Sequence, residues 1–212
     1  MKLYMIPGLC SLAPHIVACE MGMKLSLEKV DFATKKYSGG DFHKINPTGL
    51  VPALQLDSGE ILTEASAISL YLAGQKPDAK LLPKEGSLER ARTHQWLNFI
   101  ATEIHKAFTP VFLGERMVKN PEGLQQLKDY FKELLSSRFN LVEDHLKSNN
   151  YMAGTAFTVA DPYLYTMFRW TTLVGMSTKS WPNIQKFMGR LEDRQGVKQA
   201  MSAEDLKPWQ PA

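Results

Sequence analysis

Residues 46–68 read NPTGLVPALQLDSGEILTEASAI and contain three structural signals side by side. Two short, largely apolar runs, 53–56 and 60–63, flank the turn-forming residues 57–59, a pattern that predicts a β-hairpin. Directly after the second run, apolar residues recur at helical spacing, so that Glu64 stands at the predicted start of a helix. The stretch therefore predicts two antiparallel strands that lead into a helix.

The predicted helix start and the proline before the hairpin both favour a peptide-like ligand. The first backbone N–H groups of a helix lack intrahelical partners and attract negative charge, so we expect the amides of residues 64–66 to hold a carboxylate. Pro52 cannot donate a backbone hydrogen bond, and we expect it on a sheet edge that leaves backbone groups free for an extended peptide.

The preceding residues predict a strand, a helix and a second strand. Residues 2–6 form a short apolar run, and residues 25–30 alternate between apolar and polar side chains. Between them, Ser11 is a favoured helix N-cap and places Cys10 at the mouth of a helix. A helix that crosses between two strands makes them parallel. The order strand, helix, strand, strand, strand, helix is that of a thioredoxin-like domain with a four-stranded mixed sheet.

The rest of the chain predicts helices. Residues 77–86 carry two prolines and little periodicity, so they are interpreted as a linker between residues 1–76 and 87–212. Thr158 and Asp161 fit a capping box just before an apolar segment, which we expect to be the central helix of a bundle. Further helices are predicted from the apolar stripe Leu97, Ile100, Ile104, Phe108 and Val111, from Leu124, Leu127, Phe131, Leu134 and Leu135, and from Trp181-Pro182.

The composition excludes several classes of protein. Of 212 residues, 44% are hydrophobic, yet no apolar run is long enough to cross a bilayer, and the first six residues are too short for a signal peptide. We therefore expect a cytoplasmic protein. The net charge of +3 is small and the Lys and Arg residues are dispersed, which argues against nucleic-acid binding. Neither a nucleotide-binding fingerprint nor the spacing of a metal site is present.

Cys10 is the strongest candidate for chemistry. A thiol at a helix N-terminus feels the helix dipole, which favours the thiolate and predicts a pKa below the usual value of about 8.5. The alternative is that Cys10 is a small buried apolar residue, the common role of free cysteine. Cys19 falls on the apolar side of the same helix, too far from Cys10 to pair with it, and is interpreted as structural. With no Cys-x-x-Cys pair, a self-contained dithiol cycle is excluded.

A polar line on a later helix is the second candidate. Asn98, Thr102, His105 and Thr109 fall at helical spacing beside the apolar stripe, and a solvated face is the alternative interpretation. The remaining histidines are expected at the surface or in packing, namely His15, His43, His94 and His145.

The motifs resemble those of a known family. Residues 47–54 (PTGLVPAL) and 62–68 (LTEASAI) are similar to the glutathione-binding half of the glutathione S-transferases. With residues 7–11 (PGLCS) and 96–106 (WLNFIATEIHK), the chain is most similar to the bacterial beta class. The resemblance implies the cytosolic glutathione transferase fold, with a glutathione-binding domain at residues 1–76 and an all-helical domain at 87–212 that contributes the electrophile-binding site. It also implies a homodimer.

The resemblance further implies roles for individual residues. Cys10 would lie beside the glutathione sulfur, Lys35 at the glycyl end, and Val51, before a cis proline, along the cysteinyl backbone. Glu64 and the amide of Ala65 would hold the γ-glutamyl end, although many family members have Ser where this chain has Ala65. A second group of implied glutathione contacts comes from the later helix, with Asn98 acting from the other subunit: Asn98, Thr102, Glu103, Ile104, His105 and Lys106.

The function implied is transfer of the glutathione thiolate to hydrophobic electrophiles, a detoxification reaction with Cys10 and His105 as catalytic residues. Glutathione would be a co-substrate, with no permanently bound cofactor and no metal. Two alternatives remain open at this stage. Cys10 could be the nucleophile of a glutathione-dependent thiol-disulfide or peroxide reductase. The fold could also serve as a noncatalytic ligand-binding protein, because fold does not fix function.

Overall fold

The structure is a computed structural model that describes residues 1–211, and its first part is built around a four-stranded sheet. The strand order is β2-β1-β5-β6. Strand β1 pairs in parallel with β2 and antiparallel with β5, which pairs antiparallel with β6, so the predicted mixed sheet and its hairpin are confirmed. The strands are β1 (Lys2–Met5), β2 (Ser26–Lys29), β5 (Ala53–Gln55) and β6 (Ile61–Thr63).

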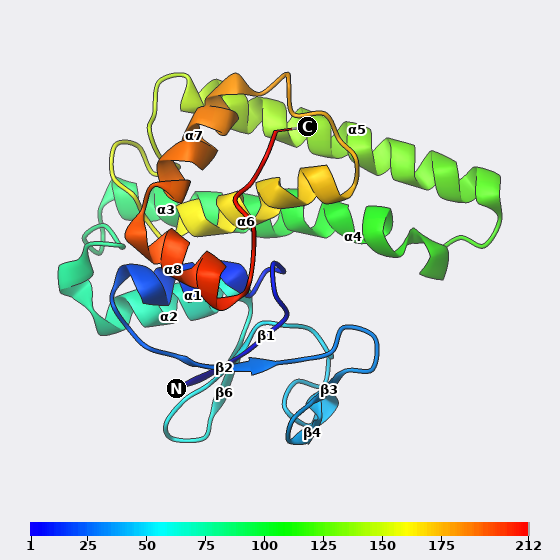
Figure 1. The fold of residues 1–212 in the computed structure, drawn as a ribbon. Coiled ribbons are helices and arrows are strands. Elements are labelled where there is room, and N and C mark those ends of the chain that lie inside the picture. Colours follow the sequence, from blue (N-terminus) through cyan, green and yellow to red (C-terminus); the bar gives the residue numbers. More distant parts are fainter. Residues whose placement is uncertain (212) are drawn as a thin grey trace.

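Helices α1 (Leu12–Glu20) and α2 (Ala65–Gln75) pack against each other above the sheet (Figure 1). The sequence predicts one apolar stripe on α1, but residues 12–18 are all buried. The reason is that α1 is enclosed from both sides, because it also packs against α6 and α8 of the helical half. One apolar core therefore runs continuously from the sheet into the helical half.

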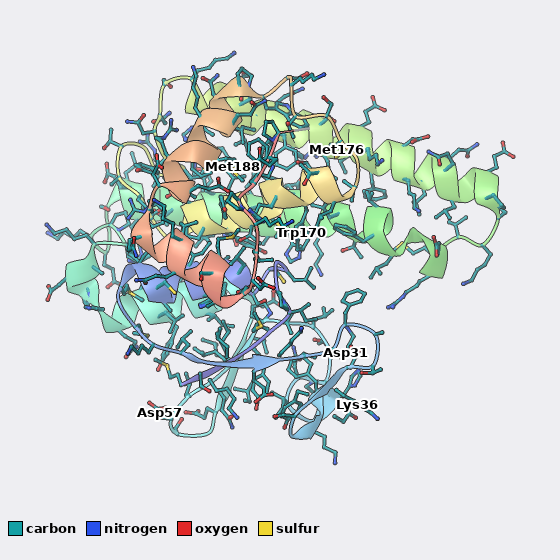
Figure 2. All side chains as sticks on the ribbon, in the orientation of Figure 1. Asp31, Lys36, Asp57, Trp170, Met176 and Met188 are labelled. Carbon is teal, nitrogen blue, oxygen red and sulfur yellow. The ribbon has the colours of Figure 1, made fainter. Side chains whose placement is uncertain are left out.

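A small hairpin fills the segment after β2. Strands β3 (Lys36–Tyr37) and β4 (Gly40–Asp41) form their own two-stranded sheet, followed by the 3₁₀-helix η1 (Phe42–Lys44). Figure 2 labels Asp31 and Lys36 in this segment. The two-residue strands are too short to show a period in sequence, which is why the hairpin is missed.

The second half of the described chain is helical, and α6 (Ala160–Leu173) lies at its centre (Figure 1). Eleven residues of α6 are buried, as predicted for the central helix. No helix within residues 1–211 combines the length and the apolar character needed to span a membrane. The other helical segments are η2 (Pro77–Ala79), α3 (Leu88–Phe99), the π-helical η3 (Ile100–His105), α4 (Lys106–Leu113), η4 (Gly114–Arg116), α5 (Pro121–Leu146), α7 (Pro182–Glu192) and α8 (Gln195–Ala203).

The start of α6 is fixed by the capping residues that the sequence indicates. The Asp161 carboxylate accepts hydrogen bonds from the Thr158 N–H at 2.7 Å and from the Thr158 hydroxyl at 3.1 Å. It also accepts the N–H of Met152 at 2.7 Å, so it ties the preceding loop to the helix. Pro182 occupies the first turn of α7, as predicted.

Two expectations from the sequence are wrong. Strand β5 lies between β1 and β6, so Pro52 precedes an interior strand instead of lying on a sheet edge. Ser11 does stand before the first residue of α1, but its hydroxyl makes no capping bond. Instead it accepts the N–H of Ile6 at 3.3 Å and donates to the Ile6 carbonyl at 3.2 Å, because the loop turns back on β1.

Candidate active site

Cys10 and Val51 meet where β1 and β5 run side by side. The loop that leaves β1 carries Cys10, and Val51 stands just before β5 in a cis bond to Pro52. Because β1 and β5 are antiparallel neighbours, the end of one lies beside the start of the other. The Cys10 thiol donates to the Val51 carbonyl oxygen, with Sγ and O 3.0 Å apart.

The turn before Val51 is held by Asn46, which the sequence alone assigns no role. The Asn46 amide donates to the Leu50 carbonyl at 2.7 Å, while its Oδ1 accepts the Thr48 N–H at 3.2 Å and the Thr48 hydroxyl at 3.0 Å. Asn46 is buried, so these bonds fix residues 46–50 from within. The backbone of Val51 is thereby presented in one position.

The thiol of Cys10 is protonated, which contradicts the sequence prediction. Burial raises its pKa to about 12, although the backbone N–H groups of Cys10 and Ser11 and the charge of Lys106 act in the opposite direction. Only 7% of the residue is exposed. Helix-terminal amides do favour the thiolate here, as expected, but loss of hydration outweighs them.

Glu64 stands at the N-cap position of α2 in a strained backbone conformation. Its φ of 70° lies in the left-handed region, which costs a non-glycine residue about 1–3 kcal/mol and recurs at functional sites. The carboxylate is near the thiol, since after burial its charge adds to the rise in the pKa of Cys10. Ala65 is buried as the first residue of the helix, so only its backbone is available to a ligand.

His105 ends the π-helical segment and points into the helical half. Its Nδ1 lies 2.8 Å from the Tyr163 hydroxyl, and its ring is edge-on to Trp170 with centroids 5.2 Å apart. Burial, and then the charge of Lys106, lower the pKa of His105 to about 4, so the imidazole is neutral at pH 7. A neutral imidazole whose Nδ1 accepts from Tyr163 presents Nε2–H as a donor.

The π-helical segment divides the predicted polar line. Asn98 and Thr102 are exposed, whereas His105 is half-buried. A π-helical turn is wider than an α-turn, so it rotates His105 away from the face that carries Asn98. Glu103 accepts a bond from Arg138 of α5 at 2.9 Å.

The two remaining implied contacts are Ile104, within the π-helical segment, and Lys35, in the sheet half. The Ile104 side chain is fully buried, so only its backbone can meet a ligand. Lys35 is half-buried in the segment before β3, and burial followed by the charge of Arg116 lowers the pKa of its ammonium group.

The loop that carries Cys10 is anchored by residues that sequence reasoning missed. The N–H of Gly8 donates to Glu204 at 2.8 Å, and its carbonyl accepts the indole N–H of Trp170 at 2.9 Å. Trp170 lies below α6, on the side of the sheet (Figure 2). Glu204 also lies 2.8 Å from the Nδ1 of His15, which is buried and not at the surface. Tyr163 and Trp170 are seven residues apart on one face of α6, so their helical spacing is a signal that could have indicated them. No sequence pattern indicates Glu204.

The structure thus brings Cys10, Val51 and Glu64 from the sheet half together with Lys106 and Tyr163 from the helical half. The charges of Glu64 and Lys106 both act on the Cys10 thiol, and those of Cys10 and Glu64 both act on the Tyr163 hydroxyl. Within residues 1–211, no three His, Cys, Asp or Glu side chains are grouped as a metal site. The arrangement suits a ligand with both charged ends and a thiol.

Comparison with known proteins identifies the family. Residues 9–75 match the family model described as glutathione S-transferase, N-terminal domain, and residues 99–195 match the corresponding C-terminal domain. The glutathione S-transferase GstA of Escherichia coli O157:H7 is 41% identical over 98% of this chain and all of its own length.

Two solved structures share both the fold and the sequence. A sphingomonad glutathione S-transferase complexed with glutathione and the bacterial beta class enzyme of Sphingomonas chungbukensis are each 42% identical to this chain, with TM-scores of 0.89. Both similarities cover 98% of this chain and all of the other. The chain therefore belongs to the glutathione S-transferase family, and its resemblance to the bacterial beta class is confirmed.

Proposed function

We propose that this protein transfers the thiolate of reduced glutathione to hydrophobic electrophiles. The observation that carries the proposal is that both halves of the chain contribute to one site. Cys10 and Val51 come from the sheet half, and Lys106 and Tyr163 come from the helical half. The glutathione complex of the sphingomonad relative supports the choice of co-substrate.

In this proposal the charged ends of glutathione meet opposite charges. The Glu64 carboxylate pairs with the γ-glutamyl ammonium, and the adjacent first-turn amides of α2, beginning with Ala65, bind the γ-glutamyl carboxylate. The Val51 backbone aligns the cysteinyl residue, and the Lys35 ammonium takes the glycyl carboxylate. The half-buried position and lowered pKa of Lys35 support this, because an ammonium in such a place gains from an anionic partner.

Activation of the glutathione thiol is assigned to three groups. The protonated Cys10 thiol can turn its single S–H from the Val51 carbonyl to the glutathione thiolate, the Lys106 ammonium attracts that thiolate, and neutral His105 presents an N–H. Lowering a thiol pKa by two units requires about 2.7 kcal/mol, which a charge and one or two hydrogen bonds can supply. Cys10 and His105 are therefore the proposed catalytic residues.

The active assembly is proposed to be a cytoplasmic homodimer. Asn98 and Thr102 are exposed on α3 and η3, where they are free to reach glutathione held by the other subunit, with Glu103 beside them. Such sharing makes each site complete only in the dimer. A reducing compartment is supported by Cys10 and Cys19, both free thiols.

The raised pKa of Cys10 favours conjugation over the reductase alternative. The thiolate is the nucleophile in disulfide exchange, and a pKa of about 12 leaves very little thiolate at neutral pH. A noncatalytic binding role would use Glu64 but not the half-buried His105 donor, which is assigned to the thiol of glutathione and not to its charged ends.

A Cys10→Ala variant tests the division of roles. We expect it to keep substantial conjugating activity with an aryl halide, within about tenfold of wild type if one hydrogen bond to the thiolate is lost. With a glutathione mixed disulfide, where Cys10 would have to be the nucleophile, we expect wild type to show little activity and the variant to lose that remainder. Glutathione affinity measured by calorimetry and the circular dichroism spectrum are the controls. Loss of the conjugating activity in a folded variant that still binds glutathione would contradict the assignment.

A further inference from the structure

Lys35 and Arg116 are two cations that lie near each other beside the proposed site. Lys35 precedes β3 and Arg116 ends η4, and Arg116 lies close enough for its charge to disfavour the Lys35 ammonium. Within residues 1–211 neither side chain forms an ion pair. Neighbouring like charges cost free energy unless an anion lies between them.

Asp31 and Glu115 are close in sequence to the two cations but, within the described residues, form no ion pair with them. Burial and then the Arg116 charge lower the pKa of Lys35, and the charge of Asp31 offsets this only in part. Asp31 accepts the N–H of Ala33 at 3.0 Å and both the N–H and the hydroxyl of Thr34, at 2.7 and 2.8 Å. Glu115, next to Arg116 in sequence, lies 3.9 Å from the ammonium of Lys128. The exposed guanidinium of Arg116 is therefore available to a ligand.

Exposed apolar side chains gather around the same two cations. Phe32 is 46% exposed and has the Lys35 ammonium 4.6 Å from its ring centroid. Close to Arg116 in sequence, Phe112 is 41% exposed and Met117, directly after Arg116, is 54% exposed. Large apolar residues left in water beside cations suit a ligand with an aromatic body and an acidic group.

The exposed Phe112 is connected by ring contacts to the proposed catalytic group. The Phe112 ring is edge-on to Trp170 at 5.4 Å, and Trp170 is edge-on to His105 at 5.2 Å. A chain of aromatic contacts thus leads from His105 to the end of α4, beside Arg116. Trp170 itself is buried, so the exposed Phe112 is the part of this chain that an aromatic ligand can contact on its way to the guanidinium.

We propose that the electrophilic substrate is an aromatic compound that carries a carboxylate or a similar acidic group, and that Arg116 binds this group. The inference rests on the proposed transferase function. Glutathione brings one glycyl carboxylate, which pairs with Lys35, so the second cation is left for the second substrate. Arg116 is thereby a specificity-determining residue.

The test uses two electrophiles that differ in one charge, 4-chloro-3,5-dinitrobenzoate and its methyl ester. In each reaction a carbon–sulfur bond forms, the carbon–chlorine bond breaks, chloride leaves with the electron pair, and the thiol proton passes to buffer. Wild type is compared with Arg116→Gln and with the control Lys119→Gln, which removes the same charge three residues away from an exposed side chain bonded to the Glu115 carbonyl.

We expect Arg116→Gln to lower kcat/KM for the benzoate about three- to tenfold, the size of a partly exposed ion pair, with the ester changed less than twofold. Added salt should reduce the wild-type activity on the benzoate more than on the ester. Lys119→Gln should change neither substrate. Comparing the ratio of variant to wild type for each substrate removes the difference in their intrinsic reactivity.

Two results would overturn the inference. Equal effects of Arg116→Gln on the benzoate and the ester would show that Arg116 does not bind the acidic group of the electrophile. A rise in the KM of glutathione with both electrophiles would show that Arg116 binds the glycyl carboxylate instead. Failure of wild type to conjugate even the ester, by contrast, would refute the proposed transferase function itself.

Discussion

At Cys10, two electrostatic effects oppose each other and their magnitudes decide the outcome. A helix terminus stabilises an adjacent negative charge by about 0.3–2 kcal/mol. The rise in the pKa of Cys10 from an ordinary value of 9.0 to about 12 corresponds to about 4 kcal/mol in favour of the thiol. Burial therefore wins, and the residue acts as a hydrogen-bond donor to Val51.

Cys10 should accordingly react slowly with alkylating agents. In a Cys19→Ser variant, which leaves Cys10 as the single thiol, we expect iodoacetamide at pH 8 to react about a thousandfold more slowly than with free cysteine, because a pKa of about 12 leaves about 10⁻⁴ of the thiol ionised. Mass spectrometry over time gives the rate. A rate within tenfold of free cysteine would show that the thiolate is stabilised after all.

At the scale of elements, the start of α6 combines a helix cap with a loop anchor. Asp161 is fully buried and accepts backbone bonds from Met152 and Thr158. Loss of its carboxylate would leave these two N–H groups without an acceptor in the interior, where each unsatisfied group costs about 1–3 kcal/mol.

Replacing Asp161 by Ala should lower the free energy of unfolding by about 2–4 kcal/mol, since a cap and a buried acceptor are lost together. Urea denaturation of the purified variant measures this. Asp144→Ala is the matched control, because Asp144 forms only an exposed pair with Lys147 and should cost less than about 0.5 kcal/mol. Equal losses in the two variants would contradict the role assigned to Asp161.

Sequence signals proved reliable where a local pattern determines the element. The turn at residues 57–59 and the Thr158–Asp161 capping pair act through neighbours within a few residues, so they predict the β5–β6 hairpin and the start of α6. The π-helical segment η3 has no such local signature. For that reason the sequence pattern predicts that the polar line including His105 lies on a single α-helical face.

The site itself depends on contacts that no local pattern records. The motif residues Cys10, Val51 and Glu64 could be named from the sequence, and the structure brings them together. The protonation state of Cys10 could not be predicted from the sequence, because Cys10 becomes buried only when the two halves of the chain pack against each other. The anchoring of Gly8 by Trp170 and Glu204 likewise joins segments far apart in the sequence.

At the scale of the whole molecule, a buried pair connects α1 with the end of α8. Burial disfavours the charged form of His15, but its hydrogen bonds with Cys19 and Glu204 raise its pKa to about 9. His15 is only 5% exposed and Glu204 only 4%, so solvent screens the pair weakly. The same Glu204 holds Gly8, which makes the pair a support for the loop of Cys10.

The pair should make stability depend on alkaline pH. The pKa of His15 in the folded protein, about 9, exceeds the unfolded value of about 6.5, so its contribution is complete below pH 6.5 and is lost as pH rises through 9. We expect the free energy of unfolding to fall by about 2 kcal/mol over this range, measured by urea denaturation at each pH.

Two variants separate this pair from other links between the same helices. Glu204→Gln should reduce the fall between pH 6.5 and 9, while the hydrogen bond of His15 with Cys19 keeps part of it. Glu20→Gln, which breaks the pair of Glu20 with Arg194 across α1 and α8, should lower stability by a similar amount at every pH. An unchanged pH dependence in Glu204→Gln would contradict the role of Glu204 in holding the proton on His15.

The bond between Gly8 and Glu204 also has a consequence for biosynthesis, because its partners are 196 residues apart. A ribosome that adds 5–20 residues per second makes the second partner about 10–40 seconds after the first. During that interval the nascent loop around Cys10 lacks its carboxylate anchor. The loop around Cys10 can therefore reach its final anchored form only after α8 and Glu204 have left the ribosome.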